Sequence, residues 1–490
     1  MSDVPRTAAA FRVRSSGGSV GRAPSVESHS IDPRNLGCST PIGCRFGVAN
    51  DSSLLQRARE VLERAPVIDG HNDVLWEARD RAGYDFDRLD LAKPCPDLMT
   101  DIPRIREGRL GGQFWSVYVP SDLPGDTAVT ATLEQIDAFH AMVRRYPETF
   151  GRTRTAKDVE RIAGRGQAPA HRAGGAQHSR GAGLAPAHPD SSWRVASMIG
   201  VEGGHSIGAS LGALRVLAHL GAGYMTLTHN DNTAWADSAT DEADHGGLTR
   251  FGEEVVREMN RLGVLVDLSN VSADTMAHAI DVSEAPVIFS HSSARALCGV
   301  PRNVPDDVLR RVGEEDGVVM VTFVPEFLTP EGVEVSKAWY AEQDRLKAEH
   351  PGDREAVEQG MESWLEAHPP PPTSVADVAD HIDHIRDVAG VAHVGVGSDF
   401  DGTESMPEGL EDVSCYPNLF AELLRRGYSD EEIAKVSREN VLRVMGEAER
   451  VAERLQATRA PSLARIEDLD SETAPARPDH QNHDRLEGLH

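Results

Sequence analysis

Long apolar runs and paired cysteines are both missing from this chain of 490 residues. No stretch of about 18 consecutive apolar residues occurs, so we expect no membrane-spanning helix. The N-terminus carries arginines but no apolar segment typical of a secretory signal. The five cysteines, Cys38, Cys44, Cys95, Cys298 and Cys415, include no Cys-x-x-Cys pair. This pattern argues against a disulfide framework and predicts a cytoplasmic protein.

Positive charge is also scarce. The chain has 50 Lys and Arg against 78 Asp and Glu, which gives a formal net charge of −28. So acidic a protein is poorly suited to bind nucleic acid or an anionic membrane, and we expect neither as a partner. The composition, 39% hydrophobic and 26% charged, is that of a globular protein.

Three segments lack the apolar periodicity of a packed fold. Residues 1–53 are rich in Ser, Gly, Arg and Pro, which predicts a disordered leader. Residues 163–193 mix Gly, Ala, Pro and His, which predicts a surface insertion, with metal binding by its histidines as the alternative. Residues 451–490 predict a polar, acidic tail. We therefore expect the folded domain to comprise residues 54–450.

Within that domain, eight β-rich runs alternate with helical patterns. The runs are residues 67–68, 112–118, 197–201, 224–228, 264–268, 286–290, 318–323 and 394–397. The alternation predicts an α/β fold, a (β/α)8 TIM-type barrel. A doubly wound sheet is the alternative, but no Gly-x-Gly-x-x-Gly follows the first run, which weakens a dinucleotide-binding interpretation.

Metal-ligating side chains follow most of these runs. They are His71, Asp73, Glu202, His229, His291 and Asp399. Because the chemistry of such barrels lies at the carboxyl ends of the strands, we expect these side chains to converge. Imidazole and carboxylate together suit zinc. A carboxylate flanked by histidines predicts a two-metal hydrolase, whose ions lower the pKa of a bound water and polarise the scissile carbonyl.

Two nearby polar residues receive lesser roles. We expect His205 to satisfy a loop rather than to touch metal. For Asp401 we expect a place in a turn or a supporting contact to a ligand.

Seven short stretches carry a family resemblance. They are DGHND (69–73), GGQFWS (111–116), EGGHSI (202–207), TLTHN (226–230), FSHSS (289–293), RNVPD (302–306) and GSDFDG (397–402). In content and order they resemble the renal, or membrane, dipeptidase family of metallopeptidases, which belongs with the amidohydrolase-type barrels. The resemblance extends from about residue 55 to 450, outside the 163–193 insertion.

The resemblance implies two zinc ions. His71 and Asp73 would hold the first, Glu202 would bridge both, and His291 would hold the second. The family usually continues its fifth strand with Asp-Leu-Ser-His or Asp-Leu-Ala-His, whereas here the residues are Asp267-Leu-Ser-Asn270. An amide oxygen is a weaker zinc ligand than an imidazole. Three outcomes are open: the second metal binds weakly, the enzyme works with one metal, or the barrel is inert.

The resemblance also implies catalytic and substrate-binding roles. His229 would face the substrate and stabilise the charge that develops on its carbonyl oxygen. Arg302 would bind the free C-terminal carboxylate of a dipeptide. Asp399 would move a proton between the bridging water and the leaving amine. The family cleaves dipeptides, often accepts a D-residue at the C-terminal position, and sometimes opens β-lactams.

We therefore predict a zinc-dependent dipeptidase, and the resemblance favours a homodimer. The main alternative is a catalytically impaired relative that binds a peptide or a protein, because Asn270 stands at a ligand position. A third possibility, hydrolysis of a non-peptide amide, would require a different carboxylate anchor than Arg302. Metal content and turnover of dipeptides distinguish these functions.

Overall fold

The computed structural model describes residues 51–163 and 193–471. The chain divides into two units, Met1–Gly43 and Cys44–His490, and every described residue lies in the second. Residues 1–50 of the predicted leader, 164–192 of the predicted insertion and 472–490 of the predicted tail lie outside the described residues, whereas residues 51–53, expected in the leader, begin helix α1 (Asp51–Arg64).

Eight parallel strands close into a barrel. Each pairs with its neighbours, and β1 joins β2 on one side and β9 on the other, so the sheet is continuous around the axis. The strands are β1 (Val67–Asp69), β2 (Leu110–Tyr118), β4 (Val195–Glu202), β5 (Ala222–Thr226), β6 (Leu265–Asp267), β7 (Ile288–Phe289), β8 (Val318–Val321) and β9 (Val394–Val396). The predicted (β/α)8 barrel is confirmed, and each of the eight runs contributes one strand.

A ninth strand, β3 (Phe150–Arg152), was not predicted. It pairs in parallel with the first residues of β4, Val195 to Ser197, outside the ring of eight. Three residues with a single apolar side chain give too short a pattern to identify a strand.

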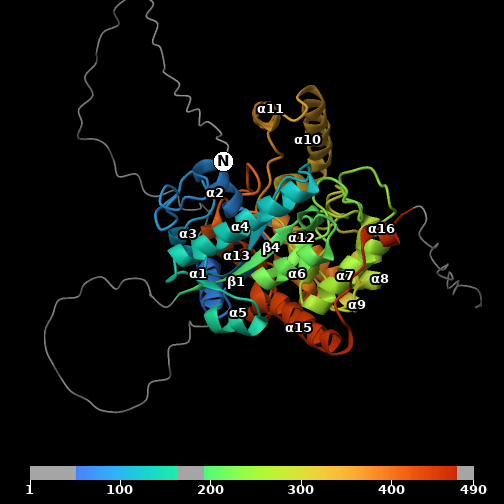
Figure 1. The fold of residues 1–490 in the computed structure, drawn as a ribbon. Coiled ribbons are helices and arrows are strands. Elements are labelled where there is room, and N and C mark those ends of the chain that lie inside the picture. The colour runs from blue at the N-terminus through green and yellow to red at the C-terminus, as the bar shows by residue number, and fades with distance from the viewer. Residues whose placement is uncertain (1–50, 164–192, 472–490) are drawn as a thin grey trace, which may run out of the picture. The chain divides into compact units, whose positions relative to one another are not determined.

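Helices surround the barrel (Figure 1). They are α1 (Asp51–Arg64), α2 (Val74–Ala82), α3 (Ile102–Glu107), α4 (Gly125–Arg145), α5 (Ala156–Ala163), α6 (Leu211–Leu220), α7 (Arg250–Leu262), α8 (Ala273–Val282), α9 (Asp306–Glu314), α10 (Pro330–Glu349), α11 (Arg354–Ala367), α12 (Val375–Ala389), α13 (Tyr416–Arg425), α14 (Asp430–Ala434), α15 (Asn440–Thr458) and α16 (Ile466–Leu469). The pair α10 and α11, drawn in gold, extends away from the other helices (Figure 1). No described helix is long and apolar enough to cross a bilayer.

The strands bury both faces. One apolar cluster fills the barrel and includes Ile68, Phe114, Met198 and Met320. Neighbouring residues on the same strands, such as Trp115, belong to the larger cluster beneath the helices. Since successive strand residues point to opposite faces, each strand supplies both clusters, which explains why the runs are almost continuously apolar.

Helix α7 shows how local sequence sets an element. The buried residues on one side of this helix recur at every fourth position, at Phe251, Val255 and Met259, as the helical period requires. The Thr249 side chain accepts a hydrogen bond from the Gly252 N–H at the start of the helix. These features fix the helix against the sheet.

The folded chain continues past residue 450, where we expected the domain to end. Helix α15 runs to Thr458, and the following segment returns to α7. There Asp470 accepts hydrogen bonds from the Thr249 hydroxyl, at 2.6 Å, and from the Arg250 N–H, at 3.1 Å. The first part of the predicted tail is thus packed on the barrel helices.

Candidate metal centre

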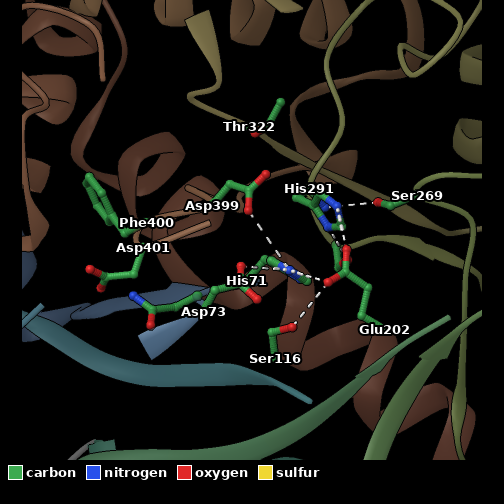
Figure 2. A network of polar contacts seen from close by, with 12 residues as sticks. His71, Asp73, Ser116, Glu202, Ser269, His291, Thr322, Asp399, Phe400 and Asp401 are labelled. Carbon is green, nitrogen blue, oxygen red and sulfur yellow. Dashed lines mark hydrogen bonds and ion pairs between the residues drawn. The ribbon is translucent and has the colours of Figure 1, made fainter. Parts of the chain in front are cut away.

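The predicted site residues meet at one end of the barrel. His71 and Asp73 follow β1, Glu202 ends β4, and His229 follows β5. Asn270 follows β6, His291 follows β7, and Asp399 follows β9. Figure 2 shows the His71, Glu202, His291 and Asp399 side chains pointing toward one another.

His71 is the centre of the first group of ligands. Its Nε2 atom lies 3.3 Å from Asp73 Oδ2, 3.4 Å from Glu202 Oε2 and 4.0 Å from Asp399 Oδ1. This nitrogen is buried and, among the described residues, has no hydrogen-bond partner. A buried nitrogen left without a partner and facing carboxylates is what a cation ligand requires, so these residues fit a metal.

The other nitrogen of His71 fixes the state of the ring. Tyr224 donates its hydroxyl hydrogen to the Gly70 carbonyl oxygen at 3.0 Å. Its oxygen, 2.8 Å from His71 Nδ1, must therefore accept a hydrogen bond from Nδ1–H. In the neutral ring the lone pair is therefore on Nε2, on the side of the carboxylates, which is the orientation that metal binding needs.

Glu202 joins the first group to a second. Its Oε1 atom lies 3.5 Å from His291 Nε2 and 3.7 Å from His229 Nε2. Ligand atoms of His71, Glu202 and His291 all lie within 4.8 Å of one another, as do those of His71, Asp73 and Asp399. Glu202 is therefore placed to touch cations on both sides.

Asn270 does not fit the second group in the same way. Its Nδ2 atom lies 3.2 Å from both Glu202 Oε1 and His291 Nε2. A donor, rather than a ligand atom, faces the position of the second cation.

Burial and neighbouring charges shift the pKa values of the site. Burial raises the pKa of Asp399 to about 8, and the adjacent Asp73 and Glu202 carboxylates contribute to the rise. Burial lowers the pKa of His229 to about 4, and the Arg302 charge acts in the same direction. His229 is therefore neutral at pH 7.

Arg302 approaches from the loop after β7. The residue is 4% exposed, and its guanidinium lies 5.3 Å from the centre of the Phe327 ring. Its Nη1 atom is buried and has no hydrogen-bond partner among the described residues. Asn303 fixes the loop by donating to the Cys298 and Phe327 carbonyl oxygens. A buried guanidinium nitrogen without a partner is suited to an anion.

Two buried carboxylates that we did not assign a role hold the ligands in place. Asp69 accepts hydrogen bonds from the backbone N–H groups of His71, at 2.8 Å, and Ser398, at 3.2 Å. Asp267 accepts one from the Ser290 N–H at 2.8 Å. Asp69 opens the DGHND stretch, two residues before His71, and Asp267 stands three residues before Asn270; that proximity was the available signal.

Gly402 leaves room for the carboxylates. A Cβ atom at this position would lie 2.4 Å from Asp73 Oδ2 and 2.5 Å from Asp399 Oδ1. Any side chain here would therefore displace both carboxylates.

The two lesser candidates lie apart from these ligands. The Nε2 atom of His205 lies 2.8 Å from the Val119 carbonyl oxygen, and the residue is absent from the ligand groups found among the described residues. Asp401 accepts a hydrogen bond from the Met99 N–H at 2.6 Å, and its carboxylate points away from His71 and Glu202 (Figure 2). Both positions agree with the supporting roles expected for them.

Comparison with known proteins identifies the family to which the chain is similar. The family model described as membrane dipeptidase, peptidase family M19, matches residues 55–173 and 183–459. Dipeptidase verJ of Clonostachys rogersoniana is 37% identical over 432 residues, which cover 85% of this chain and 92% of verJ.

Solved structures share the fold. The probable dipeptidase PvdM of Pseudomonas aeruginosa is 26% identical, with a TM-score of 0.65 over 82% of this chain and 100% of its own. A metallo peptidase of Rhodobacter sphaeroides, liganded with a phosphinate mimic of the dipeptide L-Ala-D-Ala, is 24% identical, with a TM-score of 0.61 over 79% of this chain and 99% of its own. The family match covers most of the sequence and includes every candidate ligand residue described above. The chain belongs to the membrane dipeptidase family, peptidase family M19, and is a metallo-dipeptidase, a hydrolase acting on peptide bonds.

Proposed function

We propose that the protein hydrolyses free dipeptides with the help of zinc. The observation that carries this proposal is His71 Nε2, which is buried, has no hydrogen-bond partner among the described residues, and faces the Asp73 and Glu202 carboxylates. His71, Asp73 and Glu202 would hold the ion with which the protein works. Glu202 and His291 flank a second position, where affinity for zinc would be lower because Asn270 stands where the family has an imidazole. When bound, zinc activates a water and polarises the scissile carbonyl.

Arg302 would fix the substrate through its C-terminal carboxylate. Its buried, unpartnered Nη1 atom can donate to a carboxylate that arrives in the pocket, and such charge-assisted hydrogen bonds are strong. The loop held by Asn303 keeps the guanidinium in position. Dipeptides with a free carboxylate, including those that end in a D-residue, are therefore the proposed substrates.

His229 and Asp399 would act on the peptide bond itself. The neutral His229 ring can donate an N–H hydrogen to the substrate carbonyl oxygen as negative charge develops there. The positive charge of a bound ion would lower the raised pKa of Asp399, so that its ionised carboxylate, next to His71, could take a proton from the attacking water and give it to the leaving amine. In the proposed enzyme, Arg302 would thus bind the substrate carboxylate, His229 would polarise the carbonyl group and Asp399 would protonate the leaving amine.

One observation supports a second candidate function. If Asn270 prevents formation of a working metal centre, the same pocket would bind a dipeptide through Arg302 without cleaving it. This would make the protein a peptide-binding barrel.

A dipeptide panel with metal control tests both candidates. Purified protein is assayed by amino-acid release from L,L- and L,D-dipeptides, their C-terminal amides and tripeptides, before and after chelation and after zinc is added back. We expect free dipeptides to be hydrolysed much faster than their C-terminal amides or tripeptides, with loss of activity on chelation and recovery with zinc. Binding without turnover in the zinc-loaded protein would support the second candidate, and equal turnover of the amides would contradict the role of Arg302. The homodimer implied by the family stays a prediction.

A further inference from the structure

The Asn270 side chain lies between the two residues that would hold a second cation. Its Nδ2 atom is 3.2 Å from Glu202 Oε1 and 3.2 Å from His291 Nε2. Only 1% of the residue is exposed. Protein hydrogen bonds therefore span the space that a second ion would occupy.

The protonation of His291 determines which way the amide faces. Ser290 donates its only hydroxyl hydrogen to Asp267 Oδ2, at 2.6 Å. Its oxygen, 2.9 Å from His291 Nδ1, must then accept a hydrogen bond from Nδ1–H. His291 Nε2 consequently carries a lone pair and acts as an acceptor.

Glu202 Oε1 is an acceptor as well, since its carboxylate is ionised beside the surrounding histidines. An amide oxygen turned toward two acceptors would be repelled by both, whereas the NH₂ group has one hydrogen for each. The hydrogen-bond network thus fixes the amide with nitrogen toward the site.

The backbone holds this arrangement. Asn270 has φ = +67°, in the left-handed region that asparagine adopts more readily than most residues. Its carbonyl oxygen accepts hydrogen bonds from the Ala239 N–H, at 2.8 Å, and from the Thr228 hydroxyl, at 3.1 Å. A second ion could use the amide oxygen only after the Asn270 side chain rotates and its Nδ2 hydrogen bonds to Glu202 and His291 break.

We propose that the Asn270 amide replaces the second metal ion, so that the protein works with one tightly held ion. The NH₂ group gives Glu202 and His291 the partner that a second cation would otherwise provide. The inference deepens the proposed zinc-dependent function, on which it rests, but its own subject is the metal stoichiometry. Losing an outer partner of a ligand weakens metal binding by about 10–100-fold, so replacing a ligand by a competing donor should weaken the second ion by more than about 100-fold.

The isosteric variant Asn270→Asp gives the sharpest test. It removes both donors and adds a negative charge next to Glu202, a combination that a second cation would satisfy. Zinc per chain is measured by elemental analysis after exhaustive dialysis, and the affinity of each ion by calorimetric titration with zinc. We expect one ion in the wild type and two in Asn270→Asp. The matched control is Asn260→Asp on helix α7, a buried asparagine bonded to Ser283 and Glu284, which should retain one.

Cobalt provides a readout that is independent of activity. With two equivalents of Co²⁺, Asn270→Asp should give the coupled magnetic resonance spectrum of two bridged ions, whereas the wild type should give the spectrum of an isolated ion. Asn270→His serves as a second variant if the first fails to fold, because histidine also tolerates positive φ, and we expect it to hold two ions.

Two results would overturn the inference. One is a wild type that retains two zinc ions of comparable affinity through dialysis. The other is a folded Asn270→Asp protein that still retains one. A wild type with one zinc and no dipeptide turnover would instead reject the proposed function and leave the stoichiometry inference standing.

Discussion

At the scale of single residues, Arg302 offers the clearest test of substrate binding. Arg302→Met keeps much of the apolar stem but removes the unpartnered guanidinium. Hydrogen bonds to charged groups contribute about 1.5–3 kcal/mol, so KM for free dipeptides should rise roughly 10- to 100-fold while kcat changes little. The measurement is steady-state kinetics on one dipeptide and its C-terminal amide. The amide lacks the charge, so its slower hydrolysis should hardly respond, and an equal loss for both substrates would show that Arg302 does not bind the carboxylate.

Asp399 is the residue on which the proposed proton transfer depends. Asp399→Asn keeps the size of the side chain but cannot exchange a proton, so kcat should fall by about 10²–10⁴-fold. Zinc content should stay at the wild-type value, which separates proton transfer from metal binding. The matched control is Asp401→Asn, two residues away with its carboxylate turned from the site, which should retain most of its kcat. A large loss of zinc in Asp399→Asn would make Asp399 a ligand rather than a proton carrier.

Sequence reasoning found the residues that converge but not the contacts among them. His71, Glu202 and His291 could be identified because each follows an apolar run. The direction of the Asn270 amide could not, since it follows from the Ser290 and Asp267 hydrogen bonds across neighbouring strands. Protonation and amide orientation are properties of a network in three dimensions, which a linear pattern does not contain.

At the scale of elements, the segment after α15 contributes to the stability of α7. Asp470 accepts hydrogen bonds from the Thr249 hydroxyl and the Arg250 N–H, and its charge favours the helix N-terminus. Asp470→Ala should lower the free energy of unfolding by about 1–2 kcal/mol, the usual cost of losing a helix cap. Urea denaturation measures the change. The control is Asp468→Ala, at an exposed acidic residue of helix α16, which ends just before Asp470. Its free energy of unfolding should stay within about 0.5 kcal/mol of the wild type.

The elements themselves were predictable where their apolar patterns were long. Helix α6 coincides with a long apolar stretch, Leu211 to Leu220, and the Ser-x-x-Asp sequence at the start of α12 marks a cap, in which the Ser374 N–H donates to the Asp377 carboxylate at 2.7 Å. Strand β3 and the segment that ends in Asp470 were missed, because tertiary partners rather than local periodicity hold them in place.

For the whole molecule, His381 on α12 links stability to pH. Its buried Nδ1 accepts the Ala294 N–H, at 2.9 Å, so Nε2–H donates to the Leu328 carbonyl oxygen, also at 2.9 Å. Burial lowers the pKa of His381 to about 4. Protonation is thus easier in the unfolded chain, whose histidine pKa is about 6.5. The contribution to stability is complete above pH 6.5 and is lost as the pH falls toward 4, by roughly 3 kcal/mol.

The comparison is between the wild type and His381→Asn, whose amide oxygen can still accept from Ala294. The variant should be less stable at pH 7 but show a flatter dependence of the free energy of unfolding on pH between 6.5 and 4.5. His350→Gln, at an exposed histidine, should retain the wild-type slope. Parallel curves for His381→Asn and the wild type would contradict the assignment.

The pairing of β1 with β9 determines when the barrel can close during synthesis. Asp69 accepts a hydrogen bond from the Ser398 N–H, 329 residues further along the chain. A growing chain therefore displays His71 long before Asp399 has been translated, and the unpaired edges of β1 and β8 remain open to other chains meanwhile. Such distant contacts form late and slowly, with partly folded intermediates in chains of this size. A nascent chain stalled before Val394 should depend on chaperones, because the gap between β1 and β8 stays open until β9 has been made.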